Sequence, residues 1–193
     1  MSELTEEPRA RRADAVRSRI AVLEAAARLL GERPDAGMEV IAQAAGVTRQ
    51  TVYAHFSSRD DLLTAVVDHA TVEVVAALDA AGLDEGSAAD ALLRIIGISW
   101  QILDRYPVLL RPEVADVPGD AERHHPVVLR LTRIIERGQR SGEFDRTLSA
   151  GWLAAAVIAL GHAAGGELAA ERLSAAEAQE ALRISLLRLA GAE

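Results

Sequence analysis

The sequence predicts an all-α fold of about nine helices, and three observations support that prediction. Apolar residues recur three and four positions apart through most of the 193-residue chain. Clusters of glycine, proline and serine interrupt this pattern, as they do between helices. No segment shows the alternation of apolar and polar residues that is typical of a half-buried β-strand.

A first helix is predicted at about residues 16–30, because apolar residues share one helical face there. A helix with such a stripe can cover the two short helices that follow it. The stripe is formed by Val16, Ile20, Leu23, Ala27 and Leu30.

Residues 41–56 predict a helix-turn-helix. Ile41 and Ala45 put apolar atoms on one face of a short helix, and Gly46 permits the positive φ of a tight helix exit. Thr48 stands where the N-cap of a second helix belongs, so the next residues project from its first turn. Their types, Arg, Gln and Thr, are those that contact base edges and phosphates in a major groove.

The run from Val47 to Leu63, VTRQTVYAHFSSRDDLL, resembles the TetR family of one-component transcriptional regulators. Its most specific part is Tyr-x-His-Phe followed by Ser, a basic residue, acids and Leu. Two positions depart from the usual pattern: Gly37 opens the second helix in place of Ser or Thr, and Arg59 replaces Lys. Arginine keeps the positive charge that can bind a phosphate. Together with the first helix, the resemblance covers about the first third of the chain.

The resemblance implies an N-terminal three-helix DNA-binding domain and a C-terminal helical ligand-binding and dimerisation domain. We assign residues 13–62 to the first domain and residues 63–193 to the second. Residues 1–12 are predicted to form a flexible basic arm in which a proline precedes three arginines. Such an arm could enter a minor groove or remain a solvated tail.

Six further helices are expected after the helix-turn-helix. A long fourth helix is capped by Asp60 or Ser58 and ends at Gly82, and Pro126 is expected to open the seventh. Ser174 is the expected cap of the last helix. The ranges expected for the fifth to the ninth helix are about 88–105, 108–111, 126–140, 148–168 and 175–189.

The net charge of −8 is unfavourable for binding DNA, because duplex phosphates repel an acidic surface. The charge is unevenly distributed, however. From Pro8 to Arg59 there are nine arginines and five acidic residues, a local balance of +4, while most acids lie elsewhere. A window of this size also fluctuates by a few charges by chance, so charge alone leaves DNA binding open.

The predicted second helix of the motif supplies the candidate DNA contacts. Arg49 and Gln50 are expected to reach bases, and the other candidates are expected to bind phosphates. For His55 a capping or packing role is the alternative, and Tyr53 could instead be wedged against the first helix. The candidate DNA-binding residues are Thr48, Arg49, Gln50, Thr51, Tyr53, His55 and Arg59.

The eighth predicted helix is apolar on nearly every side, so one small core can seldom cover it. The resemblance implies that the last two helices of two copies form a four-helix bundle. A homodimer of this kind reads a palindromic double-stranded DNA operator, whereas a helix buried within its own subunit is the alternative. The candidate interface residues are Ala154, Val157, Ile158, Gly161, Leu182, Ile184, Ser185 and Leu189.

The resemblance also implies a small-molecule effector bound among the fourth to eighth helices. The chain contains two Trp, two Tyr and two Phe, so an aliphatic or amphipathic effector is favoured over one held in an aromatic cage. Ordinary core or interface packing is the alternative for both tryptophans. The candidate ligand-binding residues are Trp100, Leu103, Asp104, Tyr106, Arg130, Ile134, Trp152, Ala156 and His162.

Several classes of protein are disfavoured by the sequence. Zero Cys excludes disulfides and thiolate chemistry, and no phosphate loop or catalytic constellation is present, so neither an enzyme nor a cofactor is expected. His124 and His125 lack a third ligand at helical spacing, so no metal site is expected. The longest apolar run, residues 150–161, is too short to span a bilayer, which indicates a cytoplasmic protein without a membrane partner.

The favoured function is therefore that of a homodimeric repressor released by a ligand. An activator or a corepressor-dependent regulator of the same fold is the first alternative. An all-α ligand-binding protein or enzyme without a DNA function is the second.

Overall fold

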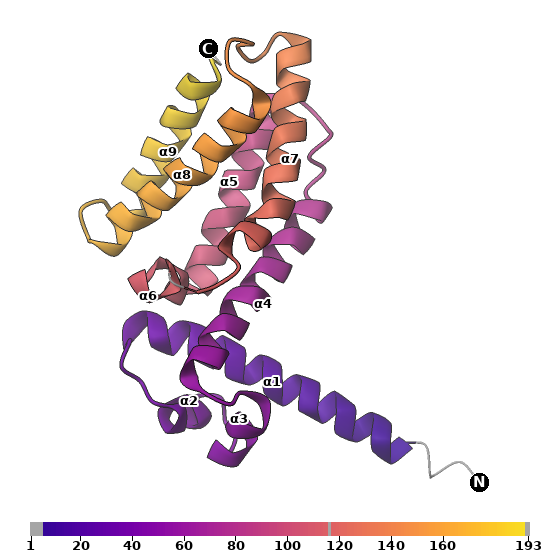
Figure 1. Cartoon of the computed structure of the whole chain (residues 1–193), viewed down its shortest axis with the longest axis vertical. Helices are drawn as coiled ribbons and strands as arrows, with labels where there is room; N and C mark the ends of the chain where they lie inside the picture. The colour runs from indigo at the N-terminus through magenta and orange to yellow at the C-terminus, as the bar shows by residue number, and fades with distance from the viewer. Residues whose placement is uncertain (1–5, 116, 192–193) are drawn as a thin grey trace. The chain divides into compact units, whose positions relative to one another are not determined.

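The structure is a computed structural model that describes residues 6–115 and 117–191. Within these residues it contains helices and no strand, which confirms the predicted all-α fold (Figure 1). The elements are α1 (Glu6–Glu32), α2 (Met38–Ala44), α3 (Arg49–His55), α4 (Arg59–Ala80), α5 (Ala88–Arg105), the 3-10 helix η2 (Pro107–Leu110), α6 (Pro112–Ala115), α7 (Asp120–Ser141), α8 (Ala150–Ala169) and α9 (Ala175–Ala190).

The chain divides into two compact units. The first unit consists of Met1–Ala70 and Arg105–Val117, and the second of Thr71–Asp104 and Pro118–Glu193. Helices α4 and α5 each contribute residues to both units. The segment 105–117, which the sequence analysis assigned to the C-terminal domain, therefore packs with the N-terminal helices.

A close backbone approach explains why this segment joins the first unit. A Cβ placed on Gly31 would lie 2.7 Å from the Cβ of Pro107, so only glycine lets α1 and η2 approach this closely. Arg111 donates from Nε to the Gly31 carbonyl at 2.9 Å. The Tyr106 ring is fully buried and meets His69 edge-on, with ring centroids 6.1 Å apart. Contacts of this kind, between residues far apart in the sequence, leave no periodic signal.

Two predicted helix starts are wrong. Helix α1 begins at Glu6 and not at Val16, and Val16 itself is 56 % exposed, so the helix continues beyond the residues that the apolar stripe marks. Residues 6–12 of the predicted arm are thus helical, and residues 1–5 lie outside the described residues. Helix α7 begins at Asp120, with Pro126 inside it. The proline removes one backbone donor without ending the helix, and its carbonyl accepts a bond from Arg130 Nη1 at 2.8 Å.

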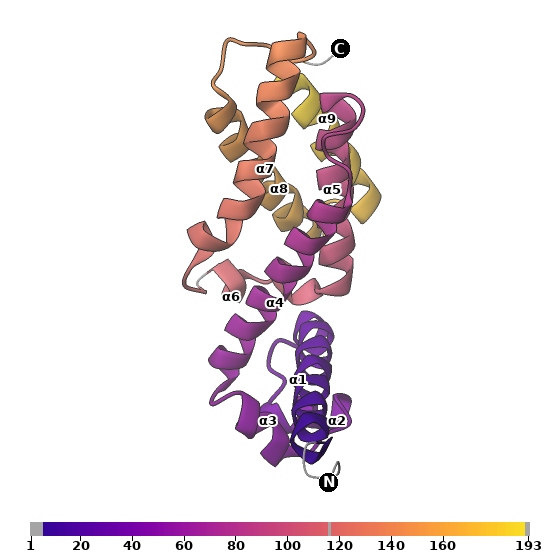
Figure 2. The same ribbon diagram turned by 90° about the vertical axis from the view of Figure 1, so that its right-hand side faces the viewer.

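The second unit is built around one hydrophobic core. Helix α8 contacts both α7 and α9, and α5 adds a further face to the same core (Figures 1 and 2). Ser149 and Ser174 cap the starts of α8 and α9 with their side chains, and Ser174 forms a capping box with Glu177. The largest fully buried side chains of this core are Leu78, Leu92, Leu131, Ile135 and Leu186.

Candidate nucleic-acid interface

The turn between α2 and α3 has the geometry that the sequence predicts. Gly46 has φ +67°, a value that strains residues with a Cβ, and its N–H donates to the Gln43 carbonyl at 3.1 Å. The N–H of Val47 donates to the Ala42 carbonyl at 3.0 Å. These bonds satisfy backbone groups at the end of α2 and fix the direction in which the chain enters α3.

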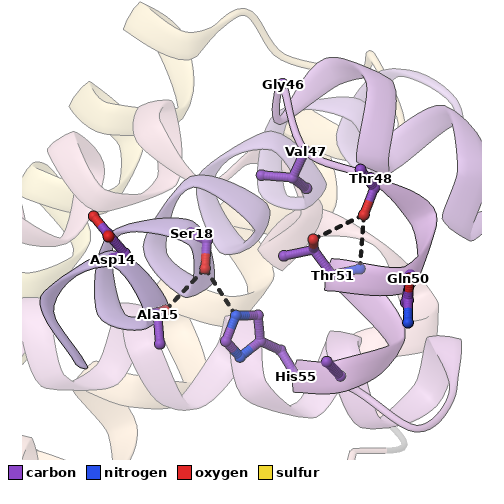
Figure 3. A pocket seen from close by; sticks show the side chains of 10 residues that line it. Asp14, Ala15, Ser18, Gly46, Val47, Thr48, Gln50, Thr51 and His55 are labelled. Atoms are coloured by element: carbon purple, nitrogen blue, oxygen red, sulfur yellow. Dashed lines mark hydrogen bonds between the residues drawn. The ribbon is translucent and has the colours of Figure 1, made fainter. Parts of the chain in front are cut away.

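Thr48 caps α3, as predicted. Its Oγ1 accepts a hydrogen bond from the Thr51 N–H at 3.1 Å, and the two hydroxyl oxygens lie 2.8 Å apart (Figure 3). By contrast Gly37, the N-cap of α2, makes no side-chain cap bond, as expected for glycine. The cap thus stabilises the first turn of α3, and both the N–H and the hydroxyl of Thr51 are engaged with Thr48.

The inner side of α3 is anchored in the core of the first unit. Val52 is fully buried and Phe56, just after the helix, is 1 % exposed. The guanidinium of Arg19 lies over the Phe56 ring at 4.6 Å from its centroid, so α1 covers this end of the motif. The outer side of α3 is left to solvent: Arg49, Gln50, Tyr53 and Ala54 are exposed.

Arg49, at the start of α3, is held loosely by two neighbours. Its Nη1 lies 3.5 Å from Oε2 of Glu39 on α2, and its guanidinium lies 5.4 Å from the centroid of the Tyr53 ring. Both side chains of the ion pair are largely exposed, so the pair is worth little in water. Arg49 can therefore exchange Glu39 for a base edge or a phosphate at small cost.

Two other candidates are engaged inside the unit. His55 Nε2 lies 2.9 Å from the Ser18 hydroxyl of α1, which favours the packing alternative for this residue (Figure 3). Arg59 donates from Nη2 to the Pro34 carbonyl. Their contacts with phosphates stay predictions. Ser18 was missed by the sequence analysis, because its spacing of 37 residues from His55 carries no periodic signal.

A surface depression lies where α1 meets the helix-turn-helix (Figure 3). The hydroxyl groups of Ser18 on α1 and of Thr48 and Thr51 at the start of α3 lie there, and Gln50 of α3 also lines the depression. Hydroxyl groups and exposed backbone at a helix start are the usual partners of DNA phosphates. The lining residues are Asp14, Ala15, Ser18, Gly46, Val47, Thr48, Gln50, Thr51, Ala54 and His55.

The candidate ligand-binding residues do not form one group in the structure. Trp100 and Ile134 are buried in the core of the second unit, whereas Tyr106 is buried in the first unit. Trp152 is 63 % exposed on α8 and His162 is also exposed. The remaining candidates also differ in surroundings: Asp104 is exposed, Leu103 and Ala156 are half-buried, and Arg130 pairs with Asp79.

The candidate interface residues are also divided. Ala154, Val157 and Leu182 are buried in the chain's own core, so within one copy they face inward. The other five, Ile158, Gly161, Ile184, Ser185 and Leu189, are half-buried. Helix α8 is apolar on nearly every side, so its sequence gives no periodic clue to which side faces inward. The exposed residues of α8 are Gly151, Trp152, Ala155, Ala159, His162, Ala163, Gly166 and Ala169.

The helix-turn-helix matches a known family, described as bacterial regulatory proteins of the tetR family, over residues 22–66. The transcriptional regulator NfxB of Pseudomonas aeruginosa is 27 % identical over 132 residues, which are 67 % of this chain and 71 % of NfxB. The transcriptional repressor LfrR of Mycolicibacterium smegmatis is 37 % identical over 94 residues, 49 % of this chain. That match spans about half of LfrR, 48 % of its length.

Solved structures extend the similarity to most of the chain. The crystal structure of LfrR in complex with proflavine has a TM-score of 0.69 at 28 % identity, over 88 % of this chain and 94 % of LfrR. The regulator FadR from Bacillus subtilis, solved with stearoyl-CoA, has a TM-score of 0.72 at 18 % identity and shares the fold. That match covers 90 % of this chain and 98 % of FadR. The region of residues 22–66, which includes the helix-turn-helix of α2 and α3, is thus of the tetR type, and the chain as a whole is similar to TetR-like transcriptional regulators.

Proposed function

We propose that the protein is a homodimeric repressor whose two α3 helices read a palindromic operator. We further propose that a small molecule bound in the second unit releases the repressor from the DNA. The observation that carries the proposal is the contrast between the two sides of α3. Val52 anchors the helix, while Arg49 and Gln50 project from its first turns into solvent. A B-DNA major groove admits one such helix, and Arg and Gln match guanine and adenine edges.

Reading by two copies supplies the specificity that one copy lacks. Two helices related by a twofold axis contact half-sites about 34–36 Å apart, one turn of DNA. Each additional half-site multiplies the discrimination against wrong sequences. The acidic net charge of −8 opposes association only where acids approach phosphates, and residues 8–59, which include α3, carry nine arginines and five acidic residues.

The test of the reading helix is the variant Gln50→Ala, measured in a gel shift with the promoter DNA beside the gene. Losing a bidentate contact costs about 1–3 kcal/mol in each half-site, so two half-sites together predict a complex that is weaker by at least about tenfold. Gln179→Ala, at an exposed position of α9, is the matched control. If Gln50→Ala and the wild type bind the operator with equal affinity, the proposal that α3 reads the operator through Gln50 is wrong.

A salt titration of the same complex separates DNA binding from the other function classes. Each neutralised phosphate adds about −0.9 to the slope of log K against log salt. Several phosphate contacts therefore predict a steep slope for the wild type. A flat titration, or no complex at all, would favour an all-α ligand-binding protein or enzyme without a DNA function.

The proposal of a homodimer is supported by the exposed side of α8. This helix is long and apolar enough to cross a membrane by length and composition alone, and 28 % of an 18-residue stretch of it is buried within the chain. Trp152 at 63 % exposure stands on that side, and an apolar surface of this kind needs cover. We propose that the α8 helix of a second copy supplies the cover, and that the protein acts in the cytoplasm.

Light scattering after gel filtration tests the dimer. Ala159→Glu places a charge in the middle of the exposed side of α8 and should convert the dimer to a monomer. Val72→Glu, at a valine of α4 that is 65 % exposed, is the control and should leave the dimer intact. If Ala159→Glu remains a dimer, the dimer interface does not include the exposed side of α8.

An effector site in the second unit is supported by the LfrR structure, which was solved with proflavine. Trp100 is buried and Trp152 is 63 % exposed, so the two tryptophans have different surroundings and are not expected to stack together on a flat ligand. We therefore propose an aliphatic or amphipathic effector that enters beside Trp100, Ile134 and Leu103. To switch occupancy completely, it must favour the released state by up to about 5.5 kcal/mol.

Tryptophan fluorescence provides the test, because Trp152→Phe leaves Trp100 as the single tryptophan. Titration with long-chain fatty acids or their CoA esters should change Trp100 emission and release the DNA. Proflavine serves as the contrasting flat ligand. If a ligand strengthens the DNA complex instead of releasing it, the protein is a corepressor-dependent regulator.

A further inference from the structure

Two histidines of the second unit face each other across neighbouring helices. The Nε2 atoms of His124 on α7 and His162 on α8 lie 3.2 Å apart, although the residues are 38 positions apart in the sequence. Their ring centroids are 4.9 Å apart and the ring planes meet at 71°. His162 is exposed and His124 is half-buried, so solvent reaches the pair.

The separation of the two nitrogens matches that of two ligands on one metal ion. Zinc binds imidazole nitrogen at about 2.0–2.1 Å, which puts two nitrogens of a tetrahedral site about 3.3 Å apart. We propose that His124 and His162 bind a first-row transition-metal ion, with Zn²⁺, Ni²⁺ or Cu²⁺ as the fitting class. Water completes the coordination, since the described residues contain no group of three or more potential metal-binding side chains.

The chemistry of the two ligands selects this class of ion. Neutral imidazole suits zinc, copper and nickel, whereas magnesium and calcium require oxygen ligands. The competing arrangement is a hydrogen bond in which one Nε2–H donates to the other Nε2. Both arrangements hold the two nitrogens at nearly the same distance. In the metal-bound form both lone pairs converge on an ion beside the N–N line, so the rings tilt while the two helices keep their positions.

The packing of both helices holds the two ligands in place. Val127 and Val128, within the turn after His124, pack against the core of the second unit. Leu160, just before His162, packs against the same core, and α7 contacts α8 directly. Much of the entropy cost of bringing the ligands together is therefore met by folding. A bound ion would join α7 to α8 and stabilise the second unit.

The sequence places His124 beside His125 and far from His162, so the neighbouring pair is the one that stands out in it. Adjacent residues of a helix point about 100° apart, so those two side chains cannot share one ion. The pair that does converge comes from two helices, and such a pair has no spacing rule. His125 is exposed on the same helix turn, which makes it a matched control.

Calorimetric titration of the full chain with Zn²⁺ or Ni²⁺ tests the proposal. We expect one ion per chain and a melting temperature that rises with added metal. His124→Gln and His162→Gln should each weaken binding more than tenfold and remove the rise, while His125→Gln should change neither. Circular dichroism and the operator gel shift show whether each variant is folded.

Imidazole ¹⁵N spectra of the wild-type protein provide a test that needs no variant. On adding Zn²⁺, the Nε2 signals of two of the five histidines should shift to metal-bound values. The proposal is overturned if no ion binds, if the metal signals belong to other histidines, or if His125→Gln weakens binding as much as His162→Gln.

Discussion

Glu39 lies where it should oppose DNA binding, and its neutralisation provides a quantitative test of the site. It is on the first turn of α2, it is exposed, and its Oε2 lies 3.5 Å from Nη1 of Arg49. In the free protein it partly neutralises the arginine that we expect to reach the operator. The variant Glu39→Gln keeps the shape of the side chain and removes the charge.

The size of the effect follows from the geometry of the pair. Two unit charges 3.5 Å apart in water interact by about 1.2 kcal/mol, and salt screens part of this. Because the side chains are 61 % and 79 % exposed, about 0.2–1 kcal/mol per subunit is the realistic range. An operator bound by two subunits should therefore be held about two- to thirtyfold more tightly by Glu39→Gln.

Fluorescence anisotropy of labelled operator at several salt concentrations measures this change. The gain in affinity should shrink as salt rises, because both the ion pair and the phosphate repulsion are screened. The carboxylate of Glu39 also interacts favourably with the positive N-terminal end of the α2 dipole, so Glu39→Gln should slightly lower the melting temperature. Unchanged or weaker operator binding by Glu39→Gln at low salt would refute the placement of Arg49 at the DNA.

Three further variants test stability. Gly138→Ala would put a Cβ 2.3 Å from Cδ2 of the buried Phe144, so the free energy of unfolding should fall by about 1–3 kcal/mol in urea titrations. Gly97→Ala, at an open position of α5, should raise it by about 0.5–1 kcal/mol, and a loss there would contradict this reasoning. The Ser174 hydroxyl and backbone lower the pKa of Glu177 below 4.5. A depressed carboxyl pKa stabilises the fold above the unfolded pKa, so Glu177→Gln should lower the melting temperature at pH 7 and cost progressively less as pH falls below 4.5.

The elements that the sequence predicts well are those specified by local chemistry. Thr48 and Ser174 cap helices because a hydroxyl can reach a backbone N–H three residues ahead, which depends on no other part of the chain. Gly46 follows the same logic, since its positive φ is a property of one residue. The helix-turn-helix contains several such signals within sixteen residues, and the structure confirms its two helices.

The features that the sequence does not predict depend on distant partners. The placement of η2 with α1 requires Gly31 and Pro107 to meet, and nothing in either segment signals the other. For α8 the difficulty is different, because alanine and glycine occupy its buried and exposed sides alike. Periodicity therefore could not tell that Ala154 faces the core while Ala155 faces solvent.

The residues that make the motif recognisable are mainly those that hold it together. Phe56 is buried under Arg19, and His55 meets the Ser18 hydroxyl of α1. These contacts fix the angle at which α3 leaves the unit, which any operator would require. In the proposed complex, discrimination between operators would rest on the exposed residues of α3, chiefly Arg49 and Gln50. Exchanging these two residues should change the preferred operator without changing the fold. Replacing the buried Phe56 should instead disturb the fold of the first unit without changing which operator sequence is preferred.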